Sequence, residues 1–311
     1  MKHPAKKVLV TGGAGFIGSS VCDEFGRYGY DVYVADNLSF GNRNTLKVHP
    51  DHFFEIDILN REALGNCFKQ VSPEIVIHLA AIHFIPYCNA HPFISSNINI
   101  QGTINVLKAA EDSGVKQFLF ASTAAVYPIA SGPLNEEMET GATDIYGLTK
   151  VAGEQFCADF AMRSKIPTLS CRFFNAFGEN ETNPHLVPEI QRQLLNGERR
   201  IQLGNLEPKR DYIHTLDLAR AIRMLLEKFS NGYEVFNIGS GREYSVKEIV
   251  EAFEESIGEK LVIEQDVSRI RKIDRPHLLA DIAKLQRFIP WEPSIDIVQG
   301  IGMLMRNKQT V

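Results

Sequence analysis

The sequence has no apolar run long enough to cross a membrane, which takes about 20 residues, and residues 1–7 lack the apolar segment of a signal peptide. It also lacks a long basic run, since its formal net charge of -5 combines both signs spread along 311 residues. A nucleic-acid partner is therefore disfavoured. We expect a globular, cytoplasmic protein that acts on a small molecule.

Cysteines are few, and none form a CxxC pair. The five are scattered along the chain: Cys22, Cys67, Cys88, Cys157 and Cys171. This pattern argues against a disulfide framework and against a zinc site, so we expect reduced, mostly buried thiols and no bound metal. The sequence also has no internal repeat, low-complexity tract or flexible linker, so any two lobes should share an interface.

Apolar strand patterns alternate with amphipathic helix patterns through the first half of the chain. The expected strands are residues 7–12, 31–36, 55–58, 74–81, 116–123 and 167–178, and the expected helices are residues 16–29, 60–71, 93–115 and 146–165. This alternation predicts an α/β fold with a doubly wound, Rossmann-like parallel sheet. After about Phe173 the pattern becomes irregular, and a helix over residues 245–258 opens with a capping box from Ser245 to Glu248. We infer a smaller C-terminal substrate lobe.

The stretch GGAGFIG places three glycines, Gly12, Gly15 and Gly18, where the first strand passes into the first helix. Glycines there let a pyrophosphate approach the unpaired N–H groups of a helix N-terminus, which predicts a dinucleotide cradle. An ordinary tight turn is the alternative. Asp36 ends the next strand, where a carboxylate accepts hydrogen bonds from a ribose diol and repels a 2′-phosphate, so NAD is favoured over NADP. Asp57 either faces the adenine end or simply forms a turn.

A series of blocks, in order, resembles the extended short-chain dehydrogenase/reductase superfamily, and specifically its nucleotide-sugar epimerases and dehydratases. They are TGGAGFIG, DNLSFGN, HLAA, NINIQGT, ASTAAVYP, YGLTK, RFFNAFG and KRDYIHTLDLARAI. The resemblance implies an NAD-binding lobe of residues 1–172 plus about 211–239, a nucleotide-sugar lobe of residues 173–210 plus 240–311, and a homodimer paired through long helices. It also implies further cofactor contacts at Phe16, Ile17, Asn37, Ile58, Leu79, Ala80, Ala81 and Asn99.

The block YGLTK carries the chemistry. Tyr146 and Lys150 are four residues apart on an expected helix, so they share a face on which the ammonium can stabilise a phenolate. Lowering a tyrosine pKa from about 10 to about 7 takes roughly 4 kcal/mol, which Lys150 and a positive nicotinamide ring could share. Thr123 ends the preceding strand and resembles the family's catalytic Ser/Thr, with Ser122 as a weaker candidate. We predict that Thr123, Tyr146 and Lys150 are catalytic and that the last two also contact the cofactor.

The residues after Thr123 bear on the reaction. The family's 4,6-dehydratases carry Asp-Glu there to move protons, whereas this chain has Ala124 and Ala125. Dehydration is therefore disfavoured, although residues 203–215 resemble the matching segment of GDP-mannose 4,6-dehydratases. A 4-epimerase needs only Tyr146 and NAD, through transient oxidation to a 4-keto sugar and re-reduction from the other face. We expect an epimerase acting on a UDP-hexose. A 4-ketoreductase, a UDP-glucuronate decarboxylase and a non-catalytic NAD-binding regulatory protein stay open.

The resemblance also implies contacts to a nucleoside-diphosphate sugar. Arg210 and Arg271 would clamp the pyrophosphate, because a guanidinium fork suits phosphate oxygens. Asn175 and Leu186 would contact the same ligand.

Three further positions bear on the choice of sugar. His83 and His185 stand where the best-known galactose epimerases have lysine and asparagine, and either contacts the substrate or is a hydrogen-bonded loop histidine. Leu278 aligns with a gatekeeper of the sugar pocket and is smaller than the tyrosine that restricts that pocket to unmodified hexoses; otherwise it is a core residue. The base and the exact sugar stay open.

Overall fold

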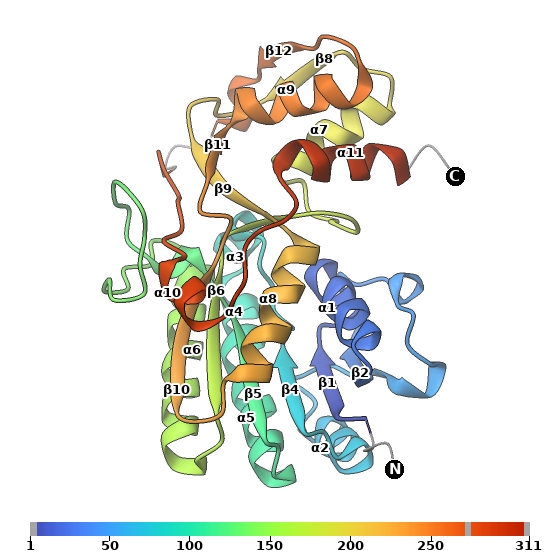
Figure 1. Cartoon of the computed structure of the whole chain (residues 1–311), viewed down its shortest axis with the longest axis vertical. Coiled ribbons are helices and arrows are strands. Elements are labelled where there is room, and N and C mark those ends of the chain that lie inside the picture. Colours follow the sequence, from blue (N-terminus) through green and yellow to red (C-terminus); the bar gives the residue numbers. More distant parts are fainter. Residues whose placement is uncertain (1–4, 271–274, 308–311) are drawn as a thin grey trace.

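The computed structural model describes residues 5–270 and 275–307 (Figure 1). Its centre is a sheet built from β1 (Lys7–Thr11), β2 (Asp31–Asp36), β3 (Phe53–Glu55), β4 (Ile75–His78), β5 (Gln117–Thr123), β6 (Thr168–Phe173) and β10 (Tyr233–Ile238). The strands lie in the order β10-β6-β5-β4-β1-β2-β3, and every neighbouring pair is parallel. The predicted doubly wound parallel sheet is confirmed.

Helices cover both faces of this sheet. On one face α1 (Phe16–Arg27) packs against α8 (Thr215–Lys228), and on the other lie α2 (Arg61–Val71), α5 (Gly102–Ser113) and α6 (Ile145–Ser164). In β1, Val8 and Val10 belong to the first core and Leu9 to the second. Because both faces are buried, the strands read as almost continuous apolar runs.

A smaller region lies beyond one end of the large sheet (Figure 1). It contains the sheet β11-β9-β7, the strand pair β12-β8 and three helices. The strands are β7 (Asn175–Phe177), β8 (Arg200–Leu203), β9 (Lys209–His214), β11 (Glu243–Ser245) and β12 (Val262–Gln265); the helices are α7 (Leu186–Leu195), α9 (Val246–Ile257) and α11 (Ile297–Asn307). The predicted capping box of α9 is confirmed, because the Ser245 side chain accepts from the Glu248 N–H and the Glu248 carboxylate accepts from the Ser245 N–H.

The chain passes between the two regions more than once. After β9 it returns through α8 and β10 to the large sheet, where β10 pairs with β6, and then leaves again through β11. Shorter helices complete the fold: α3 (Ile85–Ala90), α4 (Pro92–Ser96) and α10 (Ala283–Phe288). Across residues 5–270 and 275–307, no helix combines the length and hydropathy that a membrane span requires.

Two expected elements are divided in the structure. The strand expected over residues 167–178 ends at Phe173, and residues Asn175–Phe177 join the smaller sheet as β7, so the chain changes sheets beside Phe174. The helix expected over residues 93–115 contains a π-helical turn, Asn97–Gln101, between α4 and α5. Such turns re-aim side chains, and this one contains Asn99, which bonds to a neighbouring loop.

Two expected strands end earlier than predicted. β3 spans Phe53–Glu55 and so shares only Glu55 with the strand expected over residues 55–58, and β4, expected over residues 74–81, ends at His78. In both cases the residues that follow the strand turn away to line a cavity.

Candidate active site

A cavity of about 1230 Å³ lies at the carboxyl ends of the large sheet's strands and extends under the smaller region. Its walls include residues that follow β1, β2, β4 and β5. Between β1 and β4 the sheet reverses its winding direction, and open α/β sheets bind ligands in the crevice at this point.

Three predicted glycines form a wall where backbones approach closely. Gly12 has φ of +73°, and a Cβ there would lie 2.6 Å from the Ala80 nitrogen. A Cβ on Gly18 would lie 2.2 Å from the Gly12 carbonyl oxygen, so neither position accepts a side chain. Gly15 is the N-cap of α1 and brings no side-chain cap, which leaves the first N–H groups of the helix to a ligand. The donors fit a pyrophosphate, and Phe16 and Ile17 line the cavity beside them.

The carboxylate predicted to select the ribose lies in the same cavity. Asp36 accepts hydrogen bonds from the Ala14 N–H at 3.0 Å and the Leu38 N–H at 2.8 Å, one on each oxygen. Each oxygen keeps a further lone pair, so the group can also accept from a hydroxyl. Burial raises the pKa of Asp36 and the two backbone hydrogen bonds lower it. This acceptor fits the ribose diol of NAD, whose hydroxyls would donate to it.

Asp57 is a turn residue that also borders the cavity, and its contact with the adenine end of the cofactor stays a prediction. It lines the cavity, and it is also a turn residue, because its Oδ1 accepts from the Leu59 N–H at 2.8 Å. Its Oδ2 accepts from the Asn37 side chain at 3.0 Å. Asn37 also lines the cavity, as do Ile58, Leu79, Ala80 and Ala81.

Asn99 lies behind the cavity wall, although a cofactor contact was expected. Its Oδ1 accepts from the Ile82 N–H at 2.8 Å, and its amide donates to the Ile82 carbonyl at 2.9 Å and to the Thr149 hydroxyl at 3.0 Å. Asn99 therefore supports the loop that follows β4, and its contact with a cofactor stays a prediction.

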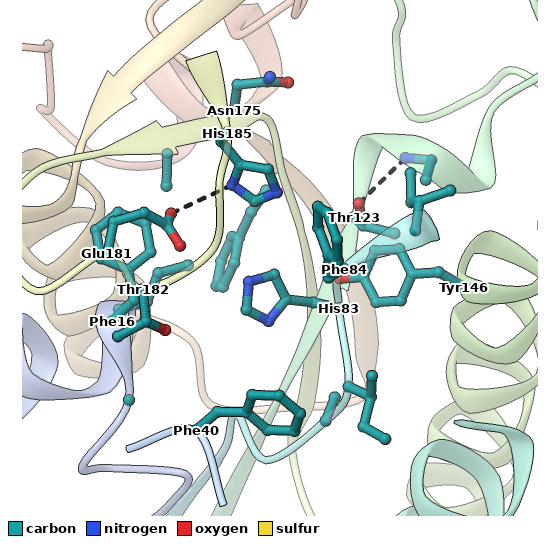
Figure 2. Close-up of a pocket in the computed structure, with 18 of the residues that line it drawn as sticks. Phe16, Phe40, His83, Phe84, Thr123, Tyr146, Asn175, Glu181, Thr182 and His185 are labelled. Carbon is teal, nitrogen blue, oxygen red and sulfur yellow. Dashed lines mark hydrogen bonds and ion pairs between the residues drawn. The ribbon is translucent and has the colours of Figure 1, made fainter. Parts of the chain in front are cut away.

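The three predicted catalytic residues converge on the cavity from β5 and α6. Thr123 ends β5, and Figure 2 shows it facing the Tyr146 ring. Lys150 follows one turn later, with its Nζ 5.8 Å from the centre of that ring and 2.7 Å from the Ala121 carbonyl oxygen, to which it donates. Burial lowers the pKa of Lys150 to about 8.

The surroundings of Tyr146 shift its pKa in opposite directions. Burial raises the pKa of Tyr146 above its ordinary value, and a hydrogen bond with Thr123 opposes this rise without cancelling it. Positive charge close to the ring would lower this pKa. The sharing of that task between Lys150 and a nicotinamide ring stays a prediction.

Ser122 and Thr123 have different surroundings. The Thr123 Oγ1 accepts from the Ala125 N–H at 3.2 Å and so caps a 3-10 turn, Ala124–Val126. The Ser122 hydroxyl donates to the Glu154 carboxylate at 2.5 Å, on the far side of the strand. This contact favours Thr123 as the hydroxyl available to a substrate.

The predicted substrate residues that the structure describes line the same cavity: His83, Asn175, His185, Leu186, Arg210 and Leu278. Arg271 lies outside the described residues. The Arg210 Nη1 donates to the Arg275 carbonyl at 2.6 Å and to the Lys209 carbonyl at 2.8 Å, and these bonds orient the guanidinium.

Leu278 fits both descriptions given to it. It is buried in a cluster with Tyr127, Leu134 and Phe174, and it lines the cavity. Its backbone is fixed against β9, because its N–H donates to the Lys209 carbonyl at 3.1 Å.

Sequence reasoning missed several residues around the site. Arg275 donates to the carbonyl oxygens of Tyr127 at 2.7 Å and Pro128 at 2.9 Å, and so holds the loop that follows Thr123. No motif marks this arginine. Glu154 pairs with Arg172 beneath the site. It lies four residues after Lys150 on the same helix, so the sequence could have placed it on the same helix face. Within the described chain, no group of three or more acidic, histidine or cysteine side chains is arranged to hold a metal. All five cysteines are free and buried, as predicted.

Comparison with known proteins gives the chain relatives over nearly its full length. The model of the NAD dependent epimerase/dehydratase family matches residues 8–239. The UDP-glucose 4-epimerase of Bacillus subtilis is 33% identical over 315 residues, which cover 92% of this chain and 91% of that protein.

Solved structures of the same fold also match this chain over nearly its full length. UDP-glucose 4-epimerase from Thermotoga maritima, determined with UDP-glucose, matches with a TM-score of 0.89 at 30% identity and covers 98% of this chain and 99% of that one. The dTDP-glucose 4,6-dehydratase from Bacillus anthracis, determined with NAD, matches with a TM-score of 0.87 at 26% identity, covering 98% and 97%. From its glycine cradle to its Thr-Tyr-Lys set, the chain belongs to the NAD dependent epimerase/dehydratase family.

Proposed function

We propose that this protein is a nucleoside-diphosphate-sugar 4-epimerase that uses NAD, with a UDP-hexose as its substrate. One observation carries the proposal: Thr123, Tyr146 and Lys150 share a cavity with the glycine cradle, and the residues after Thr123 are Ala124 and Ala125. The cavity thus supplies a single acid–base centre, Tyr146, beside the hydroxyl of Thr123.

The side chains divide the chemistry between them. Tyr146, as phenolate, takes the proton from the sugar 4-hydroxyl and later returns it to the same oxygen. Thr123 hydrogen-bonds the oxygen that gains and loses this proton, and the Lys150 ammonium stabilises the phenolate. NAD, held by the glycine cradle and Asp36, would supply a hydride acceptor for the oxidation at C4 and the hydride donor for the re-reduction from the opposite face. The net reaction inverts one carbon and consumes no cofactor.

The two alanines oppose the nearest alternative. A dehydratase must also remove a proton at C5 and protonate the hydroxyl that leaves C6, and a methyl group can do neither. Global similarity does not decide the matter, since both an epimerase and a dehydratase have this fold. A 4-ketoreductase would need a cofactor that is exchanged in every turnover, and a uronate decarboxylase would need an acidic sugar, so substrate trials separate both from the epimerase.

The decisive experiment is to incubate the purified protein with single UDP-, dTDP-, GDP- and CDP-sugars and to follow the sugar protons by NMR. We expect interconversion of the two C4 epimers of a UDP-hexose, with an equilibrium reached from either side. Tyr146→Phe is the matched control, because it keeps the ring and removes the base. Water loss, carbon dioxide release or net oxidation in place of epimerisation would contradict the proposal.

We also infer that the protein is a homodimer. Apolar side chains gather on the outer surface of α4 and α6, which pack together: Phe93, Ile94, Leu148, Phe156 and Met162. Phe93 is 91% exposed, and a patch of this kind marks an interaction surface. Light scattering tests the mass, and Phe93→Glu with Phe156→Glu should give a monomer.

The free, buried cysteines suit a reducing compartment, so we place the protein in the cytoplasm, which cell fractionation tests.

A further inference from the structure

A loop of eight residues, Gly178–His185, crosses the cavity between β7 and α7. We call it the strap. Most of its residues line the cavity: Gly178, Glu179, Asn180, Glu181, Thr182, Pro184 and His185. Figure 2 shows Glu181 and Thr182 beside Phe16 at one side of the cavity, and His185 facing His83 nearer the Tyr146 side. The strap thus extends from the glycine cradle towards the catalytic tyrosine.

Two asparagines of the strap form hydrogen bonds to the large-sheet region, and the His185 ring also packs against His83 and Phe84. The Asn180 amide donates to the Ser19 hydroxyl on α1 at 3.3 Å. The Asn183 amide bonds to the His83 Nε2 in the loop after β4 at 3.0 Å. Ser19 lies one turn after Gly15, and in Figure 2 His83 lies between Thr182 and Tyr146, with all three lining the cavity. A ligand that runs from the cradle to Tyr146 therefore lies beneath both attachments.

The bond to His83 has a defined direction. Burial lowers the pKa of His83 to about 4, so the ring is neutral at neutral pH and one of its nitrogens is an acceptor. The Asn183 Nδ2 can only donate, so the His83 Nε2 accepts and its Nδ1 carries the proton. Replacing this ring by phenylalanine would keep its bulk and remove the acceptor.

Contacts within the strap also hold its shape. The Glu181 side chain is 6% exposed and accepts from the Asn183 N–H at 3.1 Å. Its other oxygen lies 3.4 Å from the His185 Nδ1. These contacts fix the shape of the loop between the two asparagine attachments.

We propose that the strap retains the bound dinucleotide, and that its attachments, Asn183 to His83 and Asn180 to Ser19, set the rate at which NAD leaves. This assigns His83 to cofactor retention in place of the substrate contact expected from its position in the sequence. Each attachment is one hydrogen bond between neutral groups, which is weak enough for the strap to open and strong enough to slow exchange. The inference rests on NAD binding and is independent of which sugar is epimerised.

The test measures nucleotide release without any sugar. Protein loaded with NADH is diluted into excess NAD, and the decay of bound-NADH fluorescence gives the release rate. We expect His83→Phe, Asn183→Ala and Asn180→Ala each to release NADH about two- to tenfold faster than the unmodified protein, the effect of one neutral hydrogen bond. Asn196→Ala is the control: an exposed asparagine at the end of α7, outside the strap. It should leave the rate unchanged.

A double-mutant cycle separates the attachment from a general loss of structure. His83→Phe combined with Asn183→Ala should release no faster than either single variant, because both remove the same bond. Asn180→Ala should multiply the effect of either, because it breaks the other attachment. Unchanged release in the three single variants would overturn the proposal, as would a His83→Phe variant that alters KM for the nucleotide sugar but not NADH release. Epimerisation followed by NMR is a separate readout, so failure of one proposal is not failure of the other.

Discussion

Replacing Glu154 by glutamine should cost more stability than any surface charge change, because Glu154 neutralises a buried guanidinium. The side chains of Arg172 and Glu154 are 5% and 8% exposed. Arg172 donates to both carboxylate oxygens, at 2.9 and 2.8 Å, and the Ser122 hydroxyl donates to one of them at 2.5 Å. Glutamine keeps the shape but turns an NH₂ group towards Arg172 and leaves its charge unpaired. Removing one partner of such a pair costs about 3–5 kcal/mol.

Urea unfolding of the nucleotide-free protein measures this loss. The control is Glu259→Gln, which removes the exposed partner of Arg199 and should leave the unfolding midpoint unchanged. Because a buried pair can be replaced by apolar groups with little net cost, Glu154→Leu combined with Arg172→Met should recover most of the stability lost in Glu154→Gln. A decrease in the free energy of unfolding below about 1 kcal/mol for Glu154→Gln would refute the reasoning, because leaving a buried charge unpaired destabilises a protein by more than that.

Three further predictions concern the site and its pH range. Tyr146→Phe should lower kcat at least a few hundredfold, within the range of about 10² to 10⁴ for acid–base groups, while bound NAD, measured after denaturation, stays at its normal content. Leu278→Tyr should reduce kcat/KM for UDP-N-acetylglucosamine relative to UDP-glucose by about 10- to 200-fold; an unchanged ratio would make Leu278 a core residue only. Burial lowers the pKa of His78 to about 3, and its ring bonds to Thr11 and Thr103. The unfolded chain binds this proton near pH 6.5, so His78 contributes stability that is complete above pH 6.5 and lost as the pH falls towards 3. Urea midpoints across this range should fall less steeply in His78→Gln.

The fold class could be predicted from the sequence because most of the strands are buried on both faces. The alternation of apolar strands with helices predicted the parallel sheet, and the glycines predicted the cradle, because close backbone approach at Gly12 and Gly18 admits no other residue. The approach at Gly18 is to its sequence neighbours Gly12 and Gly13, whereas that at Gly12 is to Ala80, but both require glycine within the same short stretch of sequence.

The contacts that the sequence did not predict are long-range. Nothing near Arg275 marks it as a donor to the loop after Thr123, which is far away along the chain. His83 was predicted to be either a substrate contact or a hydrogen-bonded loop histidine, but the sequence did not identify its partner, Asn183, which lies 100 residues further along the chain. The divided strand at Phe174 was missed for a related reason: apolar residues stand on both sides of the break, at Phe173, Phe174 and Phe177, and only tertiary structure decides which sheet each part joins.

The late return of α8 and β10 to the large sheet has a consequence for synthesis on the ribosome. When residues up to Phe177 have emerged, α1 still lacks α8, against which it packs, and β6 presents an open edge that β10 later covers. Unpaired strand edges and exposed apolar faces favour aggregation. The large-sheet region cannot be completed before Ile238 leaves the exit tunnel, by which time β7, α7, β8 and β9 have already emerged. The nascent chain therefore has to hold an incomplete sheet while the first part of the smaller region is made, and this interval is where we expect a chaperone to be needed most.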